Sequence, residues 1–76
     1  MELNDFIKNF TAQFDDIDSN AVNEETDFKS LDGWTSLVAL SVIAMIDEEY
    51  DVTLRGDDIR NAITVKDLYE TVKSRM

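Results

Sequence analysis

Ser36 is the residue in this sequence best placed to carry chemistry, because it stands where a helix is predicted to begin. Thr35 and Ser36 precede an apolar run with helical spacing, and Gly33 just upstream allows the chain to turn sharply. A hydroxyl at this point can cap the helix by accepting hydrogen bonds from its first-turn amides. The same amides and the helix dipole would stabilise a negative charge on the serine. Position alone favours a simple cap over a modified serine.

The residue types that are missing narrow the remaining chemistry. The 76 residues include no cysteine and no histidine. A disulfide framework, a thiolate metal site and imidazole catalysis are therefore excluded. A chain of this length is expected to form one domain, residues 1–76, that is too small for a large internal active site. Chemistry has to come from hydroxyls, carboxylates or a group that is added later.

The charge of the chain indicates what kind of partner it can bind. Seventeen acidic residues against seven basic ones give a formal net charge of −10. Such a charge repels nucleic acid and anionic lipid and attracts basic protein surfaces. The N-terminus has no basic leader, and no apolar run is long enough to cross a membrane. We therefore expect a monomeric cytoplasmic protein without nucleic-acid binding or membrane insertion.

One acidic segment partly fits a calcium-binding loop. Asp16, Asp18, Asn20 and Asp27 follow the spacing of four EF-hand ligands. However, Ala21 stands where the loop needs glycine, and Asp27 replaces the bidentate glutamate. We expect no metal site here, and a calcium-responsive binder remains a minor alternative.

Apolar residues recur at helical spacing in three segments and predict three amphipathic helices with a common core. A short fourth helix with an acidic first turn is expected within residues 55–63, and Thr64 with Asp67 forms a capping-box variant that predicts a helix beginning at Val65. The sequence therefore predicts an all-α four-helix bundle of three longer helices and one short one. The three stripes are Leu3, Phe6, Ile7, Phe10 and Phe14; Ala39, Val42, Ile43, Ile46 and Tyr50; and Val65, Leu68, Tyr69, Val72 and Met76.

Residues 15–35 show no sustained periodicity and predict a long loop between the first two helices. Since a structureless connection of that length is uncommon in a small domain, we expect the loop to be ordered by scattered apolar anchors. These anchors are Ile17, Val22, Phe28, Leu31 and Trp34.

Three parts of the sequence together resemble the acyl carrier proteins, which are phosphopantetheine-binding carriers. Asp32-Gly33-Trp34-Thr35-Ser36-Leu37 resembles the family's attachment motif, in which leucine follows the modified serine. Glu48-Glu49-Tyr50 resembles the acidic and aromatic end of the family's second helix, fourteen positions after the serine. Ile63-Thr64-Val65-Lys66-Asp67-Leu68 resembles the entry to its last helix. The likeness covers essentially the whole chain.

The resemblance implies a carrier without catalytic residues of its own. Ser36 would bear 4′-phosphopantetheine, taken from coenzyme A by a phosphopantetheinyl transferase, and acyl groups would travel as thioesters on that arm. The partners implied are acyl synthases, ligases or transferases of fatty-acid, polyketide or related specialised biosynthesis. The sequence leaves open an aminoacyl or peptidyl carrier and, more remotely, an unmodified helical interaction module.

The sequence departs from the family at two places that concern partner binding. Thr35 stands where the family usually has aspartate, next to the serine. The outer side of the second helix carries few acids, which favours apolar contacts with partners. We expect partner contacts, apolar on that side and acidic elsewhere, from Thr35, Leu37, Leu40, Ser41, Ala44, Asp47, Glu48, Asp57 and Asp58.

Overall fold

A computed structural model describes residues 2–15 and 17–76 of the chain. The described residues form four α-helices: α1 (Leu3–Thr11), α2 (Ser36–Tyr50), α3 (Gly56–Asn61) and α4 (Val65–Ser74). Two 3-10 turns, η1 (Ser19–Ala21) and η2 (Phe28–Ser30), lie in the connection between α1 and α2. The predicted all-α bundle of three longer helices and one short one is confirmed. None of the helices in residues 2–15 and 17–76 is long and apolar enough to span a bilayer.

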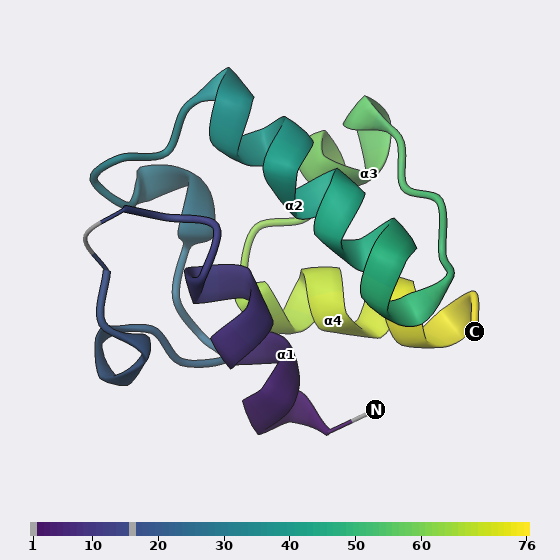
Figure 1. Ribbon diagram of the computed structural model, residues 1–76, viewed down its shortest axis with the longest axis horizontal. Coiled ribbons are helices and arrows are strands. Elements are labelled where there is room, and N and C mark those ends of the chain that lie inside the picture. The colour runs from purple at the N-terminus through teal and green to yellow at the C-terminus, as the bar shows by residue number, and fades with distance from the viewer. Residues whose placement is uncertain (1, 16) are drawn as a thin grey trace.

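The helices enclose one apolar core (Figure 1). The α2 helix crosses above α4, and α1 meets them from below in the view of Figure 1. Aromatic rings hold α1 to its neighbours: Phe6 lies with its ring centroid 5.9 Å from Tyr50 of α2 and 5.5 Å from Tyr69 of α4. The largest fully buried side chains are Phe6, Phe10, Phe28, Val42, Ile46, Val65, Leu68 and Val72.

The long loop is ordered by the anchors that the sequence predicted. Phe28 is fully buried and Val22 is buried, while Ile17, Leu31 and Trp34 pack against the core from its edge. Backbone bonds also tie the loop to α4, since the amides of Val65 and Lys66 donate to the carbonyls of Thr26 and Glu24 at 3.1 and 2.9 Å. These two bonds satisfy first-turn amides of α4 that would otherwise lack partners.

Local sequence signals account for where three helices begin. Thr64 Oγ1 accepts a hydrogen bond from the Asp67 amide, and the Asp67 carboxylate accepts one from the Thr64 amide, so the predicted capping box starts α4 at Val65. The short α3 has the predicted acidic first turn. At α2, Thr35 is the cap and Ser36 is the first helical residue.

Two predicted stripes are too long. Phe14 is buried as predicted, but α1 ends at Thr11 and Phe14 reaches the core from the turn that follows. Met76 is 65% exposed because α4 ends at Ser74, so its assignment to the core stripe was wrong. Met45, by contrast, lies outside the predicted stripe and is buried, because the 15-residue α2 packs a wider face than five positions define.

Candidate functional site

Ser36 is exposed at the N-terminus of α2, and its neighbour Thr35 performs the capping. Thr35 has an extended backbone, and its Oγ1 accepts a hydrogen bond from the Val38 amide at 3.2 Å. Its carbonyl oxygen accepts from the Ala39 amide at 3.0 Å. Because Thr35 supplies the cap, the hydroxyl of Ser36 is not needed for it. The simple-cap interpretation therefore applies to Thr35.

Trp34 anchors the chain segment that precedes Ser36 to the core. The centroid of the Trp34 ring lies 5.2 Å from that of Phe28 and 6.2 Å from that of Phe14. The Trp34 amide donates a hydrogen bond to the Leu31 carbonyl at 3.1 Å. Gly33 takes a φ of 89°, a left-handed conformation that glycine adopts without the steric cost of a Cβ. This turn and its aromatic anchor place Ser36 at the surface on a rigid support.

The electrostatic field at Ser36 comes from the end of the helix. The amides of Ser36 and Leu37 have no hydrogen-bond acceptor within the described part of the chain, whereas the first two amides of α4 are paired with the loop. No lysine or arginine occurs between residues 30 and 54. The positive end of α2, with two amides unpaired, is therefore the feature here that favours an anion.

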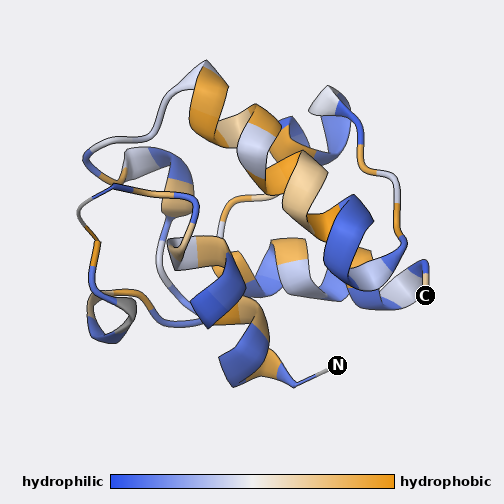
Figure 2. Ribbon diagram, viewed as in Figure 1, coloured by the Kyte–Doolittle hydropathy of each residue, from blue (hydrophilic) through white to orange (hydrophobic). Residues whose placement is uncertain are grey.

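Beyond Ser36, the outer side of α2 is apolar and exposed. Leu37 is 76% exposed and Leu40 is 62% exposed, while Ser41 and Ala44 are exposed beside them. Figure 2 shows the apolar colouring of α2 beginning in its first turn. The helix thus has apolar residues on both sides, one in the core and one in solvent. We call Leu37, Leu40, Ser41 and Ala44 the outer face of α2.

The C-terminal end of α2 carries acids that have no ion-pair partner. Asp47 and Glu48 are exposed, and neither forms a salt bridge among residues 2–15 and 17–76. No basic residue occurs in the last turn, and Asp51, which ends the helix, has a φ of 57°. Acids at the negative end of a helix dipole are unfavourable, so this end of α2 is electrostatically strained.

The two acids of α3 are engaged within the protein. Asp57 pairs with Arg60 at 2.9 Å on the open surface. Asp58 accepts from both terminal nitrogens of Arg75, at 2.6 and 2.8 Å, and from the Arg55 amide at 2.9 Å. The Arg75 hydrogen bonds, followed by the Arg55 amide, lower the pKa of Asp58 to about 2. Asp58 thus joins α3 to the end of α4, a role that the sequence did not predict.

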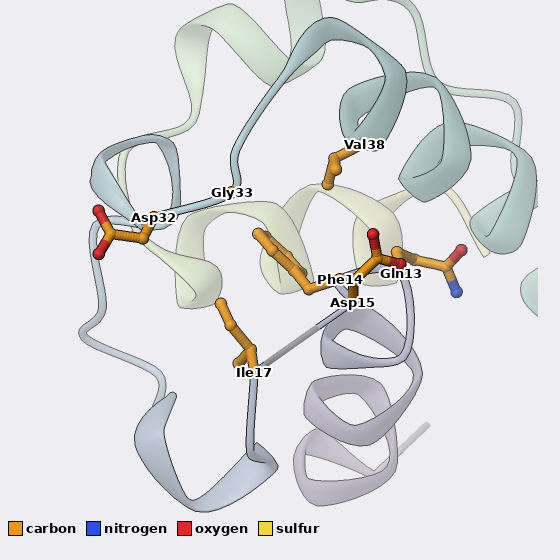
Figure 3. A pocket seen from close by; sticks show the side chains of 7 residues that line it. All are labelled: Gln13, Phe14, Asp15, Ile17, Asp32, Gly33 and Val38. Atoms are coloured by element: carbon orange, nitrogen blue, oxygen red, sulfur yellow. The ribbon is translucent and has the colours of Figure 1, made fainter.

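A cleft lies beside the approach to Ser36, and the sequence did not predict it. Figure 3 shows the side chains that line it. Its volume is about 450 Å³. At this cleft the turn after α1 lies next to the segment before Ser36 and the first turn of α2. No local sequence signal indicates that these segments meet. We call it the α1–α2 cleft, and it is lined by Gln13, Phe14, Asp15, Ile17, Asp32, Gly33 and Val38.

The acidic segment that resembled a calcium loop has a local structural role where it is described. Asp18 accepts a hydrogen bond from the Asn20 amide at 2.9 Å, and Asp27 forms an isolated bridge with Thr64. Asp16 lies outside the described residues. Within residues 2–15 and 17–76 no group of three or more acidic, histidine or cysteine side chains is placed to hold a metal ion.

Comparison with known families shows the kind of protein to which this chain belongs. The family model for the phosphopantetheine attachment site matches residues 5–72, which includes all of α2 and nearly all of the bundle. The chain belongs to the phosphopantetheine-binding carrier proteins. Members of this family bind a covalently attached 4′-phosphopantetheine group, and such carriers work with phosphopantetheinyl transferases and synthases. Comparisons with curated proteins and with solved structures gave no match.

The residues of this carrier fit the group that the family binds. A phosphodiester needs an accessible hydroxyl and a setting that tolerates negative charge, and Ser36 offers both at the uncovered end of α2. The chain has no thiol of its own, so a thiol brought by the group would be the one reactive sulfhydryl on the protein. Carrier domains of this kind are generally not catalytic themselves.

Proposed function

We propose that this carrier is an acyl carrier protein in which Ser36 bears the 4′-phosphopantetheine. The observation that carries the proposal is the position of Ser36, exposed as the first residue of α2 while Thr35 caps the helix. The proposal places the protein in fatty-acid, polyketide or related specialised biosynthesis. We also propose that it is a cytoplasmic monomer and the substrate, not the catalyst, of the reactions it enters.

The attachment is a phosphoryl transfer in which Ser36 is the nucleophile. Ser36 Oγ attacks the β-phosphorus of coenzyme A, the bond between that phosphorus and the bridging oxygen breaks, and adenosine 3′,5′-bisphosphate leaves. The transferase takes the proton from the Ser36 hydroxyl as general base. The amides of Ser36 and Leu37 then face the new phosphodiester anion.

Once attached, the group supplies a terminal thiol on a flexible tether, which carries cargo as a thioester. The part of the chain in delivery is to hold the tether at the tip of a rigid support. Trp34 and the Thr35 cap provide that support, because the turn that precedes α2 is anchored in the core through Phe28. Partner active sites can then be reached without any change in the bundle.

The outer face of α2 and the acids at its end form the docking surface in this proposal. Leu37 and Leu40 offer exposed apolar area to a partner groove. Asp47 and Glu48, which form no salt bridge with the described residues and lie at the negative end of α2, offer charge to a basic patch. Retaining acids where they cost stability is expected at functional sites. A basic partner would relieve that cost on binding.

The acids of α3 contribute less to docking in this proposal. Asp57 is exposed and pairs with Arg60, so it can exchange that arginine for a partner's cation at little cost. Asp58 is held by Arg75 and by the Arg55 amide, and a partner would have to break both interactions. We therefore propose α2 as the main charged contact and α3 as a secondary one.

An aminoacyl or peptidyl carrier remains the second candidate. Two observations favour it: Thr35 in place of the acid that fatty-acid carriers usually show to the transferase, and the apolar outer face of α2. Thr35→Asp keeps a cap and adds the missing charge. A faster modification of Thr35→Asp by a fatty-acid-type transferase would show that this enzyme reads the acid, and equal rates would show that the change is neutral.

The test of the proposal is modification in vitro. Incubation with coenzyme A and a broad-specificity phosphopantetheinyl transferase is expected to add one phosphopantetheine, seen as a mass gain of the intact protein. Ser36→Ala should abolish the gain. Ser30→Ala is the matched control, since Ser30 is an exposed serine outside the proposed docking surface, and it should be modified like the wild type. Wild-type protein that stays unmodified by several transferases would overturn the proposal.

A further inference from the structure

The α1–α2 cleft lies within covalent reach of the proposed attachment serine. Gly33 and Val38 line it and lie three residues before and two after Ser36. Because successive Cα atoms are about 3.8 Å apart, the Cα of Ser36 is at most about 11 Å from that of Gly33. Among four hollows of 410–470 Å³ on the described part of the chain, this one alone has lining residues within five positions of Ser36.

The walls of the cleft combine apolar surface with hydrogen-bond acceptors. Phe14, from the turn after α1, and Val38, from α2, point toward one another, and Ile17 lies on the loop side (Figure 3). Asp15 and Asp32 add carboxylates, and no lysine or arginine lines the cleft. Such a lining disfavours an anion and suits a neutral ligand that has both methyl groups and N–H or O–H donors.

The arm that the family attaches to its serine matches this chemistry in its middle portion. Between its phosphate and its thiol the pantetheine portion is neutral and carries a pair of methyl groups, a hydroxyl and two amide N–H groups. A chain of about 15 bonds spans on the order of 15–20 Å when extended, so the tether can fold back into the cleft. A fatty acyl chain matches less well, because it would place hydrocarbon against carboxylates without supplying donors to them.

We propose that the α1–α2 cleft binds the pantetheine portion of the arm carried by Ser36. This inference rests on the attachment at Ser36 proposed above. The phosphodiester stays at the positive end of α2, and the neutral part of the arm lies between Phe14 and Val38. The arm therefore has a resting place on its own carrier, while the outer face of α2 stays open to partners.

The test uses the thiol of the arm as a unique labelling site, because the chain contains no cysteine. The protein is loaded with phosphopantetheine, the gain in mass is verified, and a thiol-reactive nitroxide is attached. Paramagnetic broadening of backbone amide signals is then compared between the cleft segment, residues 13–15 and 17, and the outer-face residues Leu40 and Ala44. Stronger broadening in the cleft segment is expected. The diamagnetic, reduced label provides the reference intensities.

Two variants locate the resting arm. Ile17→Ala removes apolar wall from the cleft, and Ile63→Ala removes the same type of side chain from an exposed position outside the cleft and the docking surface. Ile17→Ala should reduce the broadening in the cleft segment about twofold or more, since a weakly held arm shifts its population with the loss of a few methylene contacts. Ile63→Ala should leave it unchanged.

The possible failures separate the two proposals. Protein that gains no mass contradicts the attachment at Ser36. Protein that gains the arm but shows equal or greater broadening at Leu40 and Ala44, or the same cleft broadening in Ile17→Ala, contradicts the resting place and leaves the carrier function standing.

Discussion

Replacing Glu48 with lysine is expected to stabilise the isolated protein while slowing its encounter with basic partners. Glu48 lies in the last turn of α2 together with Asp47, in a turn that contains no basic residue. An acid at the negative end of a helix costs about 0.3–1 kcal/mol, and a cation there gains a similar amount. The reversal should therefore add about 1 kcal/mol to the free energy of unfolding, which raises the Tm of a domain of this size by about 4–8 °C.

Urea denaturation at low ionic strength measures the predicted gain in the free energy of unfolding. Trp34 is the single tryptophan and packs against Phe28, so its fluorescence reports loss of the core. Glu25→Lys is the control, because Glu25 is an exposed loop residue and its reversal changes the net charge equally. A stability gain in both variants would indicate relief of the overall charge of −10, and no gain in Glu48→Lys would refute the helix-end argument.

The predicted slower encounter with partners is measured as the association rate with a phosphopantetheinyl transferase at low and high salt. Glu48→Lys should slow association several-fold at low salt and converge with the wild type at high salt, since screening removes steering between exposed charges. If Glu48→Lys and Glu25→Lys associate equally fast at low salt, the end of α2 does not guide the partner.

Three further predictions concern the support on which the site stands. Arg75→Ala should lower the free energy of unfolding at neutral pH, because it removes the partner of the Asp58 carboxylate. The pKa of Asp58 in the folded protein, about 2, is below its ordinary value of 3.8. The stability difference between Arg75→Ala and the wild type is therefore present above pH 4 and should vanish as the pH falls through 2 in acid-denaturation curves. A stability difference that stays constant with pH would contradict the pairing. Phe28→Ala should cost about 3–5 kcal/mol and unfold much of the population by circular dichroism, whereas a well-folded variant would show that Phe28 does not hold the loop. Thr35→Ala should lose about 1 kcal/mol in urea denaturation through the lost cap on the Val38 amide, and a loss equal to that of Ser36→Ala would contradict the assignment of the cap to Thr35.

Features of the fold that depend on local pattern could be predicted from the sequence. The start of α4 follows from Thr64 and Asp67, which interact across one helical turn. The burial of Phe6 and Phe10 follows from their spacing in the first stripe. The ends of α1 and α4 could not be predicted in this way, because Phe14 and Met76 continue the apolar period after the helical backbone has ended.

Features that depend on long-range contacts had no signal in the sequence. Asp58 and Arg75 are 17 positions apart, and nothing near either residue indicates their ion pair. The acid cluster at residues 57–58 therefore looked like free docking charge, whereas both of its members bind arginine within the protein. The α1–α2 cleft is equally invisible in the sequence, since it exists only where the turn after α1 passes the segment before Ser36.

The position of Ser36 required both kinds of information. The sequence placed Thr35 and Ser36 at the start of a helix, and the structure assigns the cap to Thr35 and leaves the exposed Ser36 without a capping role. The family match shows that the chain is a phosphopantetheine-binding carrier, and the attachment at Ser36 is our proposal.

Locating the modified atom tests the central claim most directly. After incubation with coenzyme A and a transferase, trypsin should release the segment from Ser30 to Arg55, which holds the three serines 30, 36 and 41. Fragmentation of this peptide in a mass spectrometer should place the phosphopantetheine on Ser36. Its placement on Ser30 or Ser41, or its absence from the peptide, would contradict the account.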